Sequence, residues 1–196
     1  MAESHSNSNS NSKLREYRER FAKGVYAVPK SSGDPALWRG KESCPALGVW
    51  HECVGIMTSR PVTGAAESRA KVMLTNILHD DVVFHPPTYW KSRYGKNISM
   101  LILTEVCKIF ESFTYHRQFV DGSRRQACLE FSAIVDGIAC QGVDMITFDR
   151  DCESGSNVLQ KIIDFKVMIR PPEAALYLKS YMSRRIKEVL SNGGKL

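Results

Sequence analysis

The 196-residue sequence contains no run of 18 apolar residues, which excludes a helix long enough to span a lipid bilayer. Its first residues show no apolar signal core. The six cysteines form no CxxC pair, and the spacing of Cys44, His51 and Cys53 matches no zinc-binding pattern. We therefore expect a cytoplasmic protein without a membrane segment, metal or cofactor, whose cysteines are buried as small apolar residues.

The sequence also lacks the pattern of a nucleic-acid-binding surface, although its net charge is +6. The basic residues lie mainly near the two ends and in short pairs such as Arg124-Arg125. No stripe in which basic and aromatic residues alternate accompanies them. We expect a solvated basic surface and no nucleic-acid partner.

What is present is an ordinary globular composition, with 43% hydrophobic and 24% charged residues. An alternating Ser/Asn tract fills most of residues 1–12, which we expect to be disordered because they cannot bury apolar surface. Residues 13–59 predict a short amphipathic helix and then an irregular arm, which either packs onto the main domain or covers a pocket mouth. The main domain is expected over residues 60–190, with a tail over 191–196.

Within the main domain, periodicity and turn signals predict helices that flank a strand meander. Thr63 can cap the first helix, Pro86 ends a short strand, and Asp121-Gly122 and Asp136-Gly137 mark turns. The expected helices cover 65–78, 97–110 and 173–190, and the expected strands cover 82–85, 114–120, 125–135, 138–148 and 161–170. This order predicts an α+β domain with a curved sheet around helices.

Five segments, in order, resemble the SnoaL-like branch of the nuclear transport factor 2 (NTF2-like) superfamily. They are residues 79–86 (HDDVVFHP), 95–96 (GK), 113–115 (FTY), 142–149 (GVDMITFD) and 165–171 (FKVMIRP). The resemblance covers roughly residues 65–185. It implies a cone-shaped fold, in which a curved antiparallel sheet wraps around helices and an apolar pocket, and commonly a homodimer through the outer sheet face.

The resemblance also implies roles for two residues. His85 falls, within a one-residue gap, where ketosteroid isomerases carry an aspartate base, and Asp144 falls where they carry a protonated oxyanion-hole aspartate. The isomerases' first-helix tyrosine has no counterpart in residues 65–78, and Gly142 replaces the arginine of the epoxide hydrolases' Arg-x-Asp motif. Both departures count against those two activities.

Strand alternation places Gly142, Asp144, Ile146 and Phe148 on one face. If that face lines the cavity, its apolar neighbours raise the pKa of Asp144. His85 would then be a base near Asp144, and Tyr89, Tyr94 and Tyr115 would be polar contacts at the pocket mouth. The candidate ligand-binding residues are Tyr89, Tyr115, Phe131, Phe165 and Ile169.

Two functions follow from these residues. The first is an NTF2-like pocket protein that binds a small apolar ligand, forms a homodimer, or does both. The alternative is a small-molecule lyase, isomerase or cyclase with His85 as base and Asp144 as acid or oxyanion donor. Both side chains also have a purely structural interpretation, since buried polar groups require hydrogen-bond partners. For the dimer contact we expect the outer sheet face, which carries Ile134, Met145 and Met168.

Overall fold

The computed structural model describes residues 44–59, 61–151 and 158–191. The predictions for residues 1–12, for the helix after residue 13 and for the tail after residue 191 concern residues outside these ranges. The helices are α3 (Pro45–Thr58), α4 (Gly64–Ile77), α5 (Lys96–Cys107) and α6 (Pro172–Ser191), and the strands are β1 (Leu78–His85), β2 (Arg93–Tyr94), β3 (Phe110–Val120), β4 (Gln126–Val135), β5 (Ile138–Phe148) and β6 (Ile162–Arg170).

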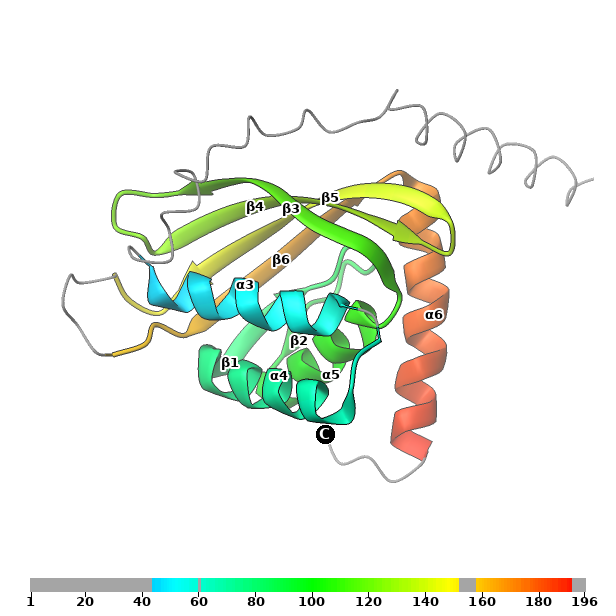
Figure 1. Ribbon diagram of the computed structural model, residues 1–196, viewed down its shortest axis with the longest axis horizontal. Coiled ribbons are helices and arrows are strands. Elements are labelled where there is room, and N and C mark those ends of the chain that lie inside the picture. The colour runs from blue at the N-terminus through cyan, green and yellow to red at the C-terminus, as the bar shows by residue number, and fades with distance from the viewer. Residues whose placement is uncertain (1–43, 60, 152–157, 192–196) are drawn as a thin grey trace, which may run out of the picture.

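The six strands form one open, curved sheet in the order β2-β1-β6-β5-β4-β3 (Figure 1). The meander β3-β4-β5-β6 is antiparallel throughout, and the short connections from β3 to β4 and from β4 to β5 allow no other pairing. β1 pairs with β6 in parallel, so the sheet is mixed where we expected an antiparallel one. The α+β fold with a sheet curved around helices is confirmed.

The curvature of the sheet has a local origin in β3. Its register against β4 shifts between Glu111 and Thr114 and again between Tyr115 and Gln118. Ser112 between the first pair has φ 51°, in the left-handed region. Such irregularities bend a strand and increase its twist. β3 and its neighbours therefore arch over the helices, as Figure 1 shows.

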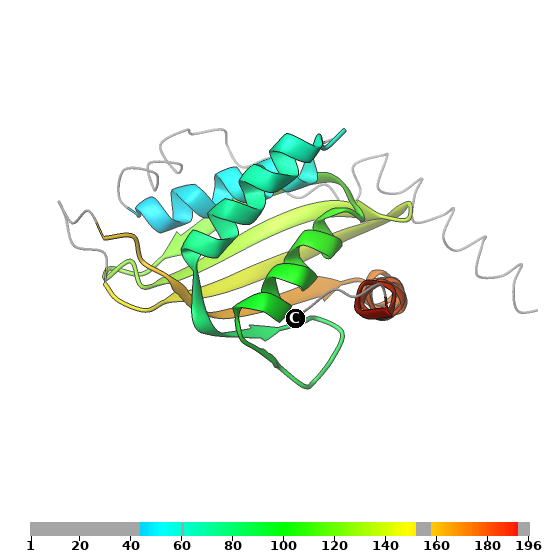
Figure 2. The ribbon, with the colours of Figure 1, turned by 90° about the horizontal axis from the view of Figure 1, so that it is seen from below.

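Three helices, α3, α4 and α5, lie on the concave face of the sheet, and α6 stands at one end of it (Figure 2). Together they enclose a core in which Trp50, Leu74 and Phe165 are almost fully buried. In the part of the chain that the structure describes, no helix has both the length and the apolar character to cross a membrane.

α3 corrects the prediction of an irregular arm up to residue 59. Leu47, Trp50, Val54 and Met57 recur at spacings of three and four, lie on one helical face and are all buried. Pro45 occupies the first turn, where its missing N–H costs nothing. The folded domain thus begins at least 15 residues before the predicted boundary at 60.

The other boundaries follow local chemistry. Thr63 caps α4 as predicted, because its hydroxyl accepts a hydrogen bond from the Ala66 N–H at 3.2 Å. β1 begins at Leu78 and is longer than the expected strand 82–85, whereas α5 stops three residues early and Phe110 begins β3. At the predicted turn, Asp136 and Gly137 have φ of 50° and 71°, the combination that tight hairpins need.

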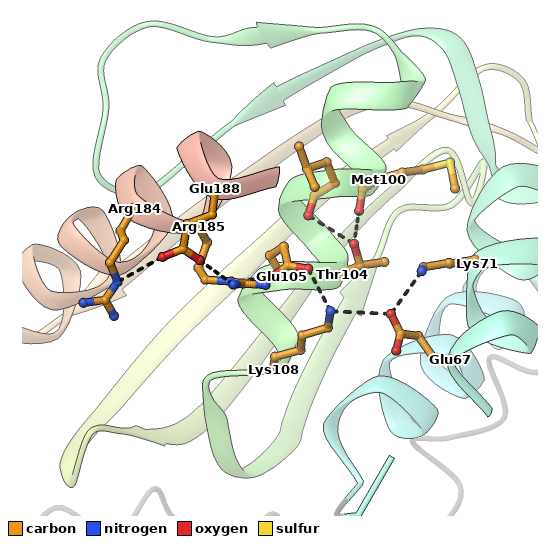
Figure 3. A network of polar contacts seen from close by, with 10 residues as sticks. Glu67, Lys71, Met100, Thr104, Glu105, Lys108, Arg184, Arg185 and Glu188 are labelled. Atoms are coloured by element: carbon orange, nitrogen blue, oxygen red, sulfur yellow. Dashed lines mark hydrogen bonds and ion pairs between the residues drawn. The ribbon is translucent and has the colours of Figure 1, made fainter. Parts of the chain in front are cut away.

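A buried carboxylate joins three helices near the end of α5 (Figure 3). Glu105 is 5% exposed, and its two oxygens accept hydrogen bonds from Lys108 Nζ at 2.7 Å and Arg185 Nε at 3.0 Å. Lys108 also lies 3.5 Å from Glu67 on α4, and Arg185 bonds Glu188 within α6. The network fixes α6 to α5 beside the cavity described next.

Candidate functional site

A cavity of about 270 Å³ lies between the concave face of the sheet and helices α3, α5 and α6. Its floor comes from alternate residues of the meander, and its walls come from apolar helix residues. We call one side of the cavity its mouth. There the segment after β1 and the helix α6 supply polar residues that are partly or fully exposed. The mouth residues are Thr88, Tyr89, Arg93, Ser183 and Lys187.

Among the described residues that form this lining, Asp144 is the only acidic one. Asp144 lies on β5, on the same face as Gly142 and Ile146, and it is 5% exposed. Burial raises the pKa of Asp144 from 3.8 to about 7, and the hydrogen bond from Tyr115 opposes this by lowering it. Near neutral pH the side chain therefore exists both as a hydrogen-bond-donating acid and as a carboxylate.

A chain of hydrogen bonds ends at Asp144. Trp50 Nε1 on α3 donates to the Tyr115 hydroxyl at 3.0 Å, and that hydroxyl donates to Asp144 Oδ2 at 2.5 Å. Burial first and the Asp144 charge second hold the pKa of Tyr115 well above its usual value, so Tyr115 stays a donor. Among the described residues nothing hydrogen-bonds Asp144 Oδ1.

Gly142 gives the floor of the cavity its shape. A Cβ at this position would lie 2.2 Å from the Phe131 ring and 2.6 Å from the Met168 carbonyl oxygen. Only glycine therefore lets the Phe131 ring lie against β5. Phe131 in turn stacks on Phe113 with ring centroids 5.0 Å apart, which forms an aromatic surface beside Asp144.

His85 does not belong to the site, and the predicted proximity of His85 and Asp144 is wrong. Phe84 pairs with Phe165 and faces the cavity, so its neighbour His85 faces the opposite side of the sheet. His85 Nε2 is 2.7 Å from Asp164 Oδ2 on the outer face. His85 Nδ1 is 2.9 Å from Ser92 Oγ. The histidine is held in a surface hydrogen-bond network and cannot act as a base in the cavity.

The structure brings the five predicted ligand-binding residues into one lining: Tyr89, Tyr115, Phe131, Phe165 and Ile169. Tyr89 lies at the mouth as expected. Tyr115 instead lies deep in the cavity against Asp144 and Trp50, because β3 arches over the sheet. Tyr94, a further candidate for the mouth, is 71% exposed and outside the lining.

Sequence reasoning missed Trp50, Arg93 and Lys187. A signal for Trp50 existed in the helical spacing of the apolar residues of 45–58, but Gly48 and Gly55 made that segment look irregular. No local signal marks Arg93 and Lys187, which are 94 residues apart in sequence and meet the same cavity only in the folded chain.

The cysteine and histidine group near residue 50 does not form a metal site. Cys44 Sγ donates to Gln160, and Cys53 Sγ donates to the Ala70 carbonyl at 3.4 Å. Burial raises the pKa of the Cys53 thiol to about 12, which disfavours the thiolate that a metal requires. Over the described ranges no three His, Cys, Asp or Glu side chains are arranged to hold a metal ion.

Solved structures establish the family. A crystal structure of a steroid delta-isomerase from Pseudomonas aeruginosa is 33% identical and superposes with a TM-score of 0.60, covering 76% of this chain and 95% of that chain. An uncharacterized conserved bacterial protein with a cystatin-like fold, from Silicibacter pomeroyi, is 27% identical with a TM-score of 0.59, covering 75% and 91%. No protein-family model and no curated protein matches the sequence. The chain belongs to the NTF2-like superfamily, as the resemblance predicted.

Proposed function

We propose that the protein binds a small apolar molecule in the cavity and holds a carbonyl or hydroxyl oxygen of that molecule against Asp144. The observation that carries the proposal concerns the described residues: their lining contains a single carboxyl group, one oxygen of which has no hydrogen bond, among mainly apolar side chains. Its protonated form donates to a carbonyl oxygen, and its carboxylate accepts from a hydroxyl. Tyr115 and Trp50 fix the orientation of the group in either state.

An isomerase is the second candidate, which the raised pKa of Asp144 and the 33% identity to a protein named steroid delta-isomerase favour. Moving a double bond beside a ketone needs a base at carbon and a donor at the carbonyl oxygen. The lining formed by described residues has no imidazole and no second carboxylate. Asp144 cannot fill both roles at once, and His85 lies on the other face. The geometry therefore favours binding.

Calorimetric titration with three matched naphthalenes tests the proposal: 2-acetylnaphthalene, 2-naphthalenemethanol and 2-ethylnaphthalene. The ketone and the alcohol should bind about three- to tenfold tighter than the hydrocarbon, as expected for one neutral hydrogen bond. Ketone binding should weaken as the pH rises through about 7, because the donating proton is lost.

The Asp144→Leu variant should bind all three compounds equally. Asp164→Asn, which changes an aspartate on the outer face of β6, should retain the wild-type preferences. Equal binding of the ketone and hydrocarbon by the wild-type protein, or binding of neither, would contradict the proposal. Wild-type conversion of a β,γ-unsaturated ketone into its conjugated isomer, lost in Asp144→Asn, would instead support the isomerase.

We further propose that the protein works in the reducing environment of the cytoplasm. The five described cysteines, Cys44, Cys53, Cys107, Cys128 and Cys140, are free thiols. Burial raises the pKa of Cys140 to about 12, so it is unreactive as a thiol. Microscopy of a fluorescent fusion tests the location, and a signal confined to an oxidising compartment would contradict it.

A further inference from the structure

The mouth of the cavity carries positive charge that the floor does not. Arg93 on β2 and Lys187 on α6 both line the cavity, whereas Asp144, the only acidic residue among the described lining residues, is buried on the floor. Lys179, about two helical turns before Lys187, lies near the same mouth over the ring of Tyr89. The cavity is thus apolar inside and cationic where it opens.

The charges of these cations are not neutralised by a carboxylate of any residue that the structure describes. In the described part of the chain, Arg93, Lys179 and Lys187 form no ion pair with a carboxylate. Their neighbours on α6 differ: Arg184 lies 4.0 Å from Glu188, and Arg185 bonds Glu105 and Glu188. Arg184 and Arg185 are therefore paired with carboxylates of the protein. The positive charges at the mouth have no such partner among the described residues and can interact with a bound anion.

Tyr89 organises the mouth. The Arg93 guanidinium carbon and Lys179 Nζ each lie 5.5 Å from the centre of its ring, which places both cations against the electron-rich ring. The Tyr89 hydroxyl is hydrogen-bonded to Ser183 on α6. This bond joins the segment after β1 to α6, so cations from two separate elements are held around one opening.

We propose that the bound molecule is an amphipathic anion, with an oxyanion such as a carboxylate or sulfate held by Arg93 and Lys187 and an apolar body extending toward Asp144. This inference rests on the proposed function and adds the ligand class. An arginine fork suits a planar or tetrahedral oxyanion, and low-dielectric walls focus the field of unpaired charges at an opening. The volume of about 270 Å³ is near the lower end for ligand pockets, which suits a small ring system.

The test uses two fluorescent probes that share one apolar body: 8-anilinonaphthalene-1-sulfonate, which is an anion, and N-phenyl-1-naphthylamine, which is its uncharged counterpart. The full-length protein should bind the sulfonate more tightly, and 0.5 M NaCl should weaken only the sulfonate. The double variant Arg93→Gln/Lys187→Gln should weaken sulfonate binding about tenfold, at about two- to fivefold for each cation. It should change the Kd of the uncharged probe less than about twofold.

Two further variants locate the effect. Arg184→Gln removes a charge from the same helix outside the lining and should leave both affinities unchanged. Val167→Trp, which fills the cavity, should abolish binding of both probes, with circular dichroism confirming the fold. Sulfonate binding that survives Val167→Trp, or a double variant that affects both probes equally, would overturn the inference alone. Wild-type protein that binds neither probe would overturn the proposed function and the inference together.

Discussion

The Tyr115 hydroxyl on β3 reaches across β4 to donate a 2.5 Å hydrogen bond to Asp144 on β5. This contact fixes one carboxyl oxygen, and the other has no hydrogen-bond partner among the described residues. It also opposes the effect of burial on the acid, because a donated hydrogen bond favours the carboxylate. The chemistry of the site depends on the balance of these two effects.

The first prediction concerns the pH dependence of folding. Asp144 has a pKa of about 7 in the folded protein and an ordinary value of 3.8, so the folded state binds more protons between these pH values. The stability due to Asp144 is full below about pH 4 and is lost as the pH rises through about 7. The wild-type protein should therefore lose unfolding free energy relative to Asp144→Asn as the pH rises from about 4 to about 7. The difference between the two proteins should change by up to about 4 kcal/mol over this range. Urea unfolding at several pH values measures it, and a constant difference would contradict the shift.

The second prediction concerns Tyr115→Phe. Removing the hydroxyl removes the hydrogen bond that lowers the Asp144 pKa, so this pKa should rise above about 7. Trp50 Nε1 also loses its acceptor, and the variant should lose about 1–3 kcal/mol of unfolding free energy. A carbon-13 NMR titration of the Asp144 carboxyl gives the pKa. Tyr94→Phe, at an exposed tyrosine, is the control, and an unchanged Asp144 pKa in Tyr115→Phe would show that the bond is unimportant.

The third prediction compares two glycines. Gly142→Ala places a methyl group against the Phe131 ring and the Met168 carbonyl oxygen. Because this oxygen belongs to the backbone, it cannot shift without a cost in free energy. We expect a loss of about 1–3 kcal/mol in unfolding free energy and weaker binding of apolar probes. Gly55→Ala adds the same methyl group to an exposed helix position with open space and should gain about 0.5–1 kcal/mol. Thermal unfolding of both variants distinguishes them, and equal effects would contradict the crowding at Gly142.

The fourth prediction concerns Glu105. Burial raises its pKa, but the hydrogen bonds from Lys108 and Arg185 outweigh that effect and hold the pKa below its usual 4.5. The stabilisation is therefore present above about pH 4.5 and is lost as the pH falls through the lower folded pKa. Glu105→Gln should lose about 1–3 kcal/mol at pH 7 and show less acid destabilisation than the wild type. Chemical unfolding at pH 3 and pH 7 checks this, with exposed Glu52→Gln as control.

The fifth prediction concerns assembly. Phe119, Cys128 and Met145 are register partners in one row of the outer sheet face, and Phe119, Met145 and Met168 are 61%, 40% and 57% exposed. We propose that a second copy of the chain covers this face in a homodimer. Sedimentation at tens of micromolar should show a dimer that Met145→Lys/Met168→Lys dissociates. Leu176→Lys, at an exposed apolar residue of α6, should leave it intact, and a monomeric wild type would refute the proposal.

Much of the fold was predictable because local chemistry decides it. The bounds of β5 at 138 and 148 agree with the alternation of its apolar residues, and Thr63 and the Asp136-Gly137 turn act as their types predict. The same alternation placed Asp144 on one face with Ile146 and Phe148, and the structure shows that Asp144 lines the cavity. The prediction for α3 failed because two glycines weaken its helical pattern, and packing of Trp50 and its neighbours supplies the missing stabilisation.

The sequence by itself determined the elements from α4 to α6 except the two-residue β2, and which residues of β4, β5 and β6 share a face, because these depend on periodicity and turn signals within a few residues. It indicated the family through five segments that resemble NTF2-like proteins. Only the tertiary structure decided which groups meet. A shift of one residue along a strand moves a side chain to the other face of the sheet. The one-residue gap at His85 therefore places its side chain on the outer face, opposite the cavity face that carries Asp144. The contact of Tyr115 with Asp144 depends on how β3 bends. The position of Arg93 and Lys187 at one mouth depends on how α6 packs against the sheet. Both are set by the packing of many residues that are distant in sequence.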